Sequence, residues 1–170
     1  MLKKDLGVNI LAVPKVTKVV INVGIGASKT NPKFDQITET TLLAVTGQKP
    51  KATRARQAIS SFKIRQGEKI GKMVTLRGKR MADFLTKLAN IVLPRMRDFR
   101  GLSLKGFDKK GNYNFGIPEQ IIFPEISHEK AEILHGMSVS IVTTAKDPNE
   151  GRKLLETWGF PFEKGASNVK

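Results

Sequence analysis

The sequence lacks cysteine altogether, and its 170 residues include only two histidines, one tryptophan and one tyrosine. A chain without cysteine cannot form a disulfide, a thiolate zinc site, an iron–sulfur cluster or a catalytic thiol. No apolar run approaches the roughly 18 residues of a membrane span, and residues 1–14 contain no run of signal-peptide length. These absences predict a soluble cytoplasmic protein with no membrane partner.

Acidic residues are also few, because 15 Asp and Glu stand against 30 Lys and Arg, which gives a formal net charge of +15. The first 110 residues carry 24 basic and 7 acidic side chains, whereas the last 60 carry 6 and 8. The excess is densest between Lys49 and Arg80, where Glu68 is the only acid. Like charges at this density repel one another, and a bound polyanion relieves that repulsion. The pattern favours nucleic acid as a partner, with a merely solvated basic surface as the alternative.

A hydrophobic content of 39% is typical of a folded chain, and we take residues 1–170 as a single domain. Alternating or β-branched runs predict strands at residues 15–23, 48–52, 72–77 and 138–144, with a brief buried strand plausible at 120–123. Helical spacing predicts helices at residues 34–45 and 79–93 and a final helix capped by Asp147, with ordered loops between 98 and 126. This irregular alternation predicts an α+β fold, in which helices cover one face of an antiparallel or mixed sheet. A mobile basic loop is expected at about 55–71, because that segment is punctuated by glycine and has no apolar stripe.

No catalytic or metal-binding motif is complete. Gly24-x-Gly26 lacks the third glycine of a dinucleotide fingerprint, and the glycines at 67 and 71 are too closely spaced for a phosphate loop. His128 and His135 have acidic neighbours, but the second histidine of a zincin motif is missing. No serine lies in a nucleophile elbow. The sequence therefore predicts no catalytic residue, no metal and no cofactor, and a protein that is not an enzyme.

A polar binding surface remains the best candidate for function. Four polar residues fall on or beside predicted strands: Asn22, Gln48, Thr75 and Arg77. Strand alternation allows them to share one face, while neighbouring apolar residues point to the core: Ile21, Val23, Val74 and Leu76. Amides, hydroxyls and a guanidinium suit the many acceptors of RNA. An ordinary solvated strand face is equally consistent with this pattern.

The same residues carry a resemblance that covers nearly the whole chain. The motifs are Val20-Ile21-Asn22-Val23-Gly24, Thr46-Gly47-Gln48-Lys49-Pro50, Phe62-Lys63-Ile64-Arg65-Gln66-Gly67, Val74-Thr75-Leu76-Arg77-Gly78, Pro94-Arg95-Met96-Arg97-Asp98-Phe99-Arg100-Gly101 and Glu119-Gln120-Ile121-Ile122-Phe123-Pro124. With these motifs the chain resembles the family of bacterial large-subunit ribosomal protein five, which binds 5S rRNA in the central protuberance.

The resemblance implies a structural constituent of the large subunit, ribosome-bound in the cytoplasm, whose free sheet face meets 5S rRNA through Asn22, Gln48, Thr75 and Arg77. It implies that the basic loop reaches P-site tRNA, with Arg56, Lys63, Arg65 and Gln66 as the contacting residues. It also implies contact with neighbouring large-subunit rRNA. The region from Asp108 to Tyr113 would approach a small-subunit head protein through an intersubunit bridge.

Two departures from the family pattern accompany this resemblance. The start at Met1-Leu2-Lys3 implies a shortened first helix, and Lys51 occupies a position that is usually aliphatic, which moves a core contact to the surface or adds a phosphate contact. Two rival functions stay open on the residues alone. One is a free-standing nucleic-acid chaperone or DNA-compacting protein, and the other is a nucleotide-dependent enzyme.

Overall fold

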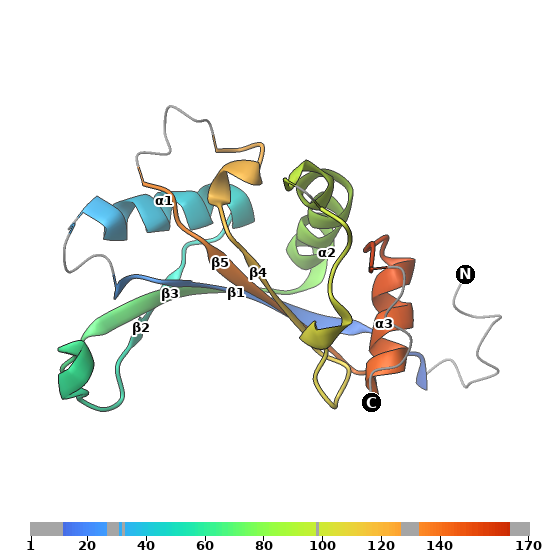
Figure 1. Cartoon of the computed structure of the whole chain (residues 1–170), viewed down its shortest axis with the longest axis horizontal. Coiled ribbons are helices and arrows are strands. Elements are labelled where there is room, and N and C mark those ends of the chain that lie inside the picture. Colours follow the sequence, from blue (N-terminus) through green and yellow to red (C-terminus); the bar gives the residue numbers. More distant parts are fainter. Residues whose placement is uncertain (1–11, 27–30, 32, 98, 127–132, 164–170) are drawn as a thin grey trace. The chain divides into compact units, whose positions relative to one another are not determined.

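A computed structural model describes residues 12–26, 31, 33–97, 99–126 and 133–163 (Figure 1). Its strands are β1 (Val16–Gly24), β2 (Lys51–Arg54), β3 (Lys69–Leu76), β4 (Tyr113–Ile117) and β5 (Met137–Thr143). Its α-helices are α1 (Lys33–Thr46), α2 (Gly78–Lys87) and α3 (Pro148–Thr157). The strands form one sheet in the order β2-β3-β1-β5-β4, with antiparallel pairing. The α+β fold expected from the sequence is therefore confirmed.

The chain divides into two compact units. Unit 1 comprises Met1–Val19, Arg77–Phe115 and Ser140–Lys170, and unit 2 comprises Val20–Leu76 and Gly116–Val139. Their joint action as a single domain stays a prediction.

In unit 2, α1 packs on one side of β1 and β3 (Figure 1). The helix begins where Asn31 Oδ1 accepts a hydrogen bond from the backbone N–H of Lys33, and it ends at Gly47, whose φ of 64° favours glycine. Its buried side chains recur at helical spacing: Phe34, Thr38, Thr41, Leu42 and Val45. The strand residues that the sequence placed in the core are buried as well: Ile21, Val23, Val74 and Leu76.

The basic loop, which we define as the residues joining β2 to β3 (55–68), has its own hydrogen-bonded structure. The N–H of Ala55 donates to Glu68 O, and the N–H of Gly67 donates to Ala55 O. A 3₁₀ turn at Ser60–Phe62 forms its tip. The sequence predicted that the loop would extend to residue 71, but residues 69–71 belong to β3 because they pair with β2. Mobility of the loop stays a prediction.

In unit 1, the helices α2 and α3 each bury apolar side chains. α2 continues through a π-helical turn at Leu88–Val92 and a 3₁₀ turn at Leu93–Arg95, so helical structure extends past the end at residue 93 that the sequence predicted. α3 starts as expected, because Asp147 Oδ1 accepts from the N–H of Glu150, and Pro148 occupies the first turn. Tyr113 is buried, its hydroxyl donates to Ser103 O, and burial raises the pKa of that hydroxyl.

Three local predictions were wrong. The brief strand that was plausible at 120–123 is not formed, and a 3₁₀ turn lies at Gln120–Ile122, where the buried Gln120 amide donates to Ile133 O and accepts from the His135 N–H. The region 98–126 was predicted as loops but contains β4. The second strand begins at Lys51 rather than at residue 48. Within the described ranges, no helix is both long and apolar enough to span a membrane.

Candidate nucleic-acid interface

The face of unit 2 opposite α1 carries several polar side chains. We call this surface the open face, and its residues include Asn22, Lys51, Thr53, Gly71, Met73 and Thr75. The register places Lys51 opposite Met73 and Thr53 opposite Gly71, so these pairs share a face. The buried residues of β3 alternate with them and lie on the other side: Lys72, Val74 and Leu76. Alternation therefore separates a polar surface from the helix-covered core.

Gly71 allows two polar side chains to approach each other on the open face. A Cβ atom at position 71 would lie 2.7 Å from Thr53 Oγ1 and 3.7 Å from Asn22 Oδ1. It would also lie 3.1 Å from the backbone oxygen of Val23. Asn22 and Thr53 thus converge over a position where a side chain would not fit. Their amide and hydroxyl offer donors and acceptors on backbone that the strands hold rigid.

The structure places the four predicted contact residues in different settings. Asn22 is exposed on β1, and Thr75 is half-buried on β3 at a position that shares the open face with Gly71. Gln48 is half-buried in the loop after α1 rather than on a strand, and its N–H donates to the Thr46 hydroxyl. Arg77 is exposed at the N-cap of α2 and belongs to unit 1. Of the four predicted contact residues, Asn22 and Thr75 therefore lie together on the open face of unit 2.

Sequence reasoning missed Thr53 as a candidate contact residue. Its place on the open face depends on the pairing of β2 with β3, which a four-residue strand does not reveal by its own pattern. Lys51 lies at a position that the family resemblance makes usually aliphatic. It is exposed and lies on the open face, opposite Met73.

A buried ammonium group joins the other side of β3 to α1. The side chain of Lys72 is only 4% exposed, and its Nζ lies 2.9 Å from Glu39 Oε2, 3.1 Å from Asp35 Oδ1 and 2.6 Å from Asp35 O. The hydrogen bond and charge of Lys72 lower the pKa of the Glu39 carboxyl. This basic residue is neutralised within unit 2 and is not available to an external polyanion.

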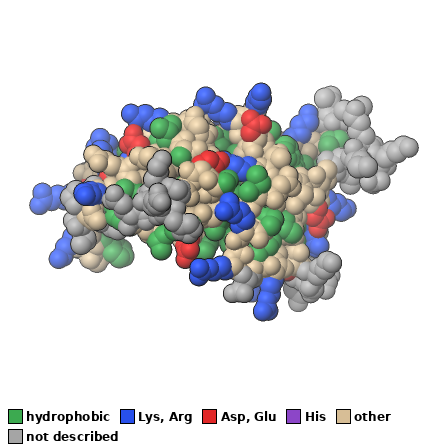
Figure 2. Space-filling model, turned by 90° about the horizontal axis from the view of Figure 1, so that it is seen from above, with side chains coloured by type: hydrophobic (Ala, Val, Ile, Leu, Met, Phe, Trp, Pro, Cys, Tyr) green, Lys and Arg blue, Asp and Glu red, His purple; other side chains and the backbone are tan. Residues whose placement is uncertain are grey.

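Other basic residues of unit 2 lie at the surface. The four predicted loop residues are all exposed: Arg56, Lys63, Arg65 and Gln66. The carboxylate of Glu68 accepts from the backbone N–H of Arg65, and Arg54 donates to Gly67 O, so the loop backbone is fixed while the side chains extend outward. Figure 2 looks onto the side on which Figure 1 draws α1, and blue basic side chains project at many points of its edge, with fewer red acidic ones among them. The exposed cations of the loop are what a polyanion-binding surface requires.

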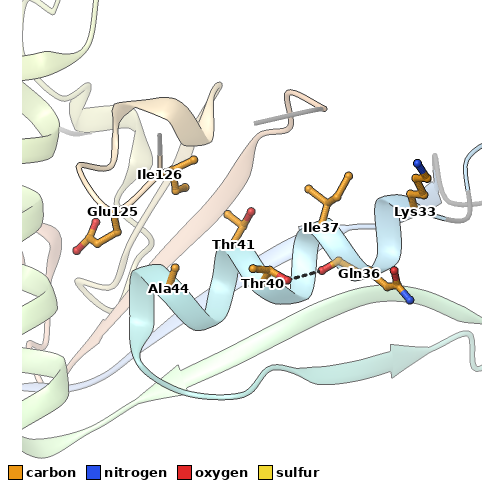
Figure 3. Close-up of a pocket in the computed structure, with 8 residues that line it drawn as sticks. All are labelled: Lys33, Gln36, Ile37, Thr40, Thr41, Ala44, Glu125 and Ile126. Carbon is orange, nitrogen blue, oxygen red and sulfur yellow. Dashed lines mark hydrogen bonds between the residues drawn. The ribbon is translucent and has the colours of Figure 1, made fainter. Parts of the chain in front are cut away.

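A groove of about 460 Å³ runs along α1 and carries no reactive group of side chains. Its lining comes from one side of the helix and from Glu125 and Ile126 (Figure 3). Ile37 and Thr41 point into it, while Thr40 donates its hydroxyl hydrogen to Gln36 O. Among the described residues that line it, Lys33 and Glu125 are the charged ones, and no nucleophile paired with a general base occurs in that set.

His135, the histidine that the structure describes, is not part of a metal site. His135 is buried, its ring lies edge-on to Phe34 at 5.5 Å, and burial lowers its pKa. His128 and its neighbours Glu129 and Glu132 lie outside the described residues. Among the residues that are described, no group of three potential metal ligands occurs.

Comparison with known proteins agrees with this non-catalytic surface. The family model for ribosomal protein L5 matches residues 9–65, and the model for the C-terminus of the same ribosomal family matches residues 69–162. The large ribosomal subunit protein uL5 of Anaeromyxobacter sp. (strain Fw109-5) is 51% identical over 164 residues, covering 96% of this chain and 91% of that protein. The uL5 protein of Thermoanaerobacter sp. (strain X514) is 54% identical over 156 residues, covering 92% and 87%. The uL5c protein of Paulinella chromatophora is 54% identical over 154 residues, covering 91% and 86%.

Two adjoining family models account for most of the chain, and relatives of near-equal length match it at half or more of the aligned positions. Members of this family are structural components of the ribosome rather than enzymes, which agrees with the lack of a catalytic cluster among the residues that the structure describes. The chain belongs to the ribosomal protein L5 family and is therefore a ribosome-bound structural component of the large subunit in the cytoplasm, not an enzyme.

Proposed function

We propose that the chain binds 5S rRNA through the open face and helps to form the central protuberance of the large subunit. Asn22 and Thr75 would contact the RNA from the strands, Gln48 from the loop after α1, and Arg77 from the start of α2. The observation that carries the proposal is the polar open face, which lies opposite the helix-covered core of unit 2 in a chain of a ribosomal family.

In this mechanism different groups supply the affinity for RNA and the selectivity for a particular RNA. Lys and Arg side chains neutralise phosphates, which gives binding that weakens as salt rises. The strands hold amide and hydroxyl groups at fixed spacing, and such a surface selects a folded RNA by its shape and its 2′-hydroxyls. Thr53 joins this set, because it converges with Asn22 over Gly71. Lys51 adds a positive charge at the edge of the same surface.

We also propose that the basic loop binds a second RNA, the P-site tRNA. Its contact residues would be Arg56, Lys63, Arg65 and Gln66, which are exposed on a hydrogen-bonded backbone. A basic tip of this kind suits the phosphates and sugars of a folded RNA. The loop and the open face would therefore bind different RNAs.

Further partners follow from the same family assignment. Neighbouring large-subunit rRNA would meet other basic surface residues. The turn from Asp108 to Tyr113 would approach a small-subunit head protein through an intersubunit bridge. In this turn Asp108 Oδ1 accepts from the N–H groups of Lys110 and Asn112, so Lys109 and Lys110 are presented on a fixed, exposed backbone.

A competition titration tests the selectivity of the open face. Labelled 5S rRNA bound to the full chain is displaced by unlabelled 5S rRNA or by duplex DNA of equal phosphate content at the same salt concentration. We expect 5S rRNA to compete at least tenfold better, because shape readout adds to the shared electrostatic term. Equal competition by the two nucleic acids would instead support a non-selective nucleic-acid chaperone.

A further inference from the structure

An exposed aromatic ring stands at the tip of the basic loop. Phe62 has 69% of its surface accessible, which is the largest exposure among the big hydrophobic side chains of the described residues. It is the last residue of the 3₁₀ turn Ser60–Phe62. Covering this ring by a partner would remove apolar surface from water, which favours binding.

The backbone beneath this ring is held in a closed turn. Ile59 and Ile64 form an antiparallel bridge in which each N–H donates to the other's oxygen, at 2.9 and 3.1 Å. Lys63 adopts a left-handed conformation with φ of 51°, and its N–H donates to Ser60 O. A turn fixed in this way presents the Phe62 ring with little backbone entropy left to lose on binding.

The charge around the ring indicates which kind of partner it meets. Lys63 follows it directly, Arg65 and Arg56 are exposed in the same loop, and Glu68 directs its carboxylate to the backbone of Arg65. An aromatic face among cationic side chains matches a nucleic-acid strand, whose phosphates attract the cations and whose bases stack on the ring.

We propose that the Phe62 ring stacks on an unpaired nucleobase of the RNA that the basic loop contacts. The inference rests on the proposed RNA-binding role of that loop and adds a residue and a type of contact to it. Bases that are splayed out of a helix are available for such stacking, whereas paired bases are not. The loop would thus recognise an RNA fold that exposes a base, in addition to phosphate charge.

The test uses substitutions at position 62 that distinguish the effect of an aromatic ring from the effect of an apolar side chain of similar size. The full chain is titrated against a uridine decamer that carries one 2-aminopurine. We expect Phe62→Ala and Phe62→Leu to weaken binding by about 5- to 150-fold, the range for loss of one stacked base. Phe62→Tyr, which retains the ring, should stay within about threefold of the wild type, since tyrosine also provides a stacking face. Ile59→Ala is the matched control, since it removes another exposed apolar side chain from the same turn.

Two readouts distinguish stacking from charge and from loss of folding. The wild type and Phe62→Tyr should quench 2-aminopurine fluorescence, and Phe62→Leu should not. Phe62→Leu should leave the dependence of affinity on salt unchanged, whereas Lys63→Ala should reduce that slope by about 0.7. Thermal melting should be the same for the wild type and the Phe62 variants. The proposal is overturned by a Phe62→Leu chain that binds and quenches like the wild type, or by a wild type that ignores the decamer in low salt.

A parallel titration with a tRNA transcript separates this inference from the assignment of tRNA to the loop. Weaker tRNA binding by Lys63→Ala together with full binding by Phe62→Leu would retain the loop assignment and refute the stacking. Phe62-dependent binding of the decamer without any tRNA binding would retain the stacking and refute tRNA as the partner.

Discussion

Replacing Arg77 with alanine is expected to weaken binding of 5S rRNA by about 1.5 to 3 kcal/mol, the range for a hydrogen bond that involves a charged group. This corresponds to a loss of affinity of roughly 10- to 150-fold. Arg77 is exposed, and its side chain makes no capping hydrogen bond at the start of α2, so its removal should leave the fold unchanged. Fluorescence anisotropy with the full chain and labelled 5S rRNA, at one fixed salt concentration, measures the effect.

Matched variants separate a specific contact from general charge. Arg80→Ala removes an equal charge from an exposed position on the same helix and should weaken 5S binding far less. Arg77→Lys keeps the charge but loses the planar guanidinium, so it should recover only part of the affinity. Lys63→Ala should leave 5S binding nearly unchanged while weakening the contact with tRNA. If Arg77→Ala affected only tRNA and Lys63→Ala only 5S rRNA, the two surfaces would be assigned the wrong way round.

The second large effect concerns the stability of unit 2. Lys72→Ala should lower the free energy of unfolding by about 3 to 5 kcal/mol, because it removes a buried aliphatic chain and leaves two acidic side chains without their cation. Lys72 Nζ is the shared partner of Asp35 and Glu39, and it links β3 to α1. Urea unfolding of the full chain at pH 7, followed by circular dichroism, gives this free energy.

A methionine at position 72 provides the matched control. Lys72→Met keeps the buried aliphatic chain and loses only the ammonium group, so it should cost less than alanine. It should still destabilise the fold, because it leaves the buried Asp35 Oδ1 without its cation. The pKa of Glu39 is lowered in the folded chain by Lys72. Its contribution is therefore complete above the unfolded pKa of about 4.3 and is lost as pH falls through the folded value. Lys72→Met should lack this acid-dependent loss, and an unchanged pH profile would contradict the role given to the ion pair.

Local signals in the sequence predicted α1 but not β4. Asn31, the spacing of Phe34, Leu42 and Val45, and the stop at Gly47 all favour one helix, and the structure has it at Lys33–Thr46. β4 contains Asn114 and Gly116, which have low strand propensity, and its strand conformation depends on pairing with β5. Pairing between segments distant in the sequence is not visible in either segment alone.

The candidate site also has one part that local sequence signals predict and one part that depends on strand pairing. The alternation of Asn22 with Ile21 and Val23 was enough to predict a polar side chain opposite buried ones, and the burial of both isoleucine and valine confirms it. The convergence of Thr53 with Asn22 needed the register of β2 on β3 and the lack of a side chain at Gly71. Short polar strands are placed by their partners, so their functional residues appear only once the sheet is assembled.

Photocrosslinking from the two sides of unit 2 tests the central claim most directly. Benzoylphenylalanine is placed either at Lys51, which is exposed on the open face, or at Leu43, which is 47% exposed on α1. Each full-length variant is irradiated with 5S rRNA under identical conditions. We predict a crosslink to 5S rRNA from position 51 and none from position 43. A crosslink from position 43 with none from position 51 would show that the RNA binds the helix side, and would contradict the account.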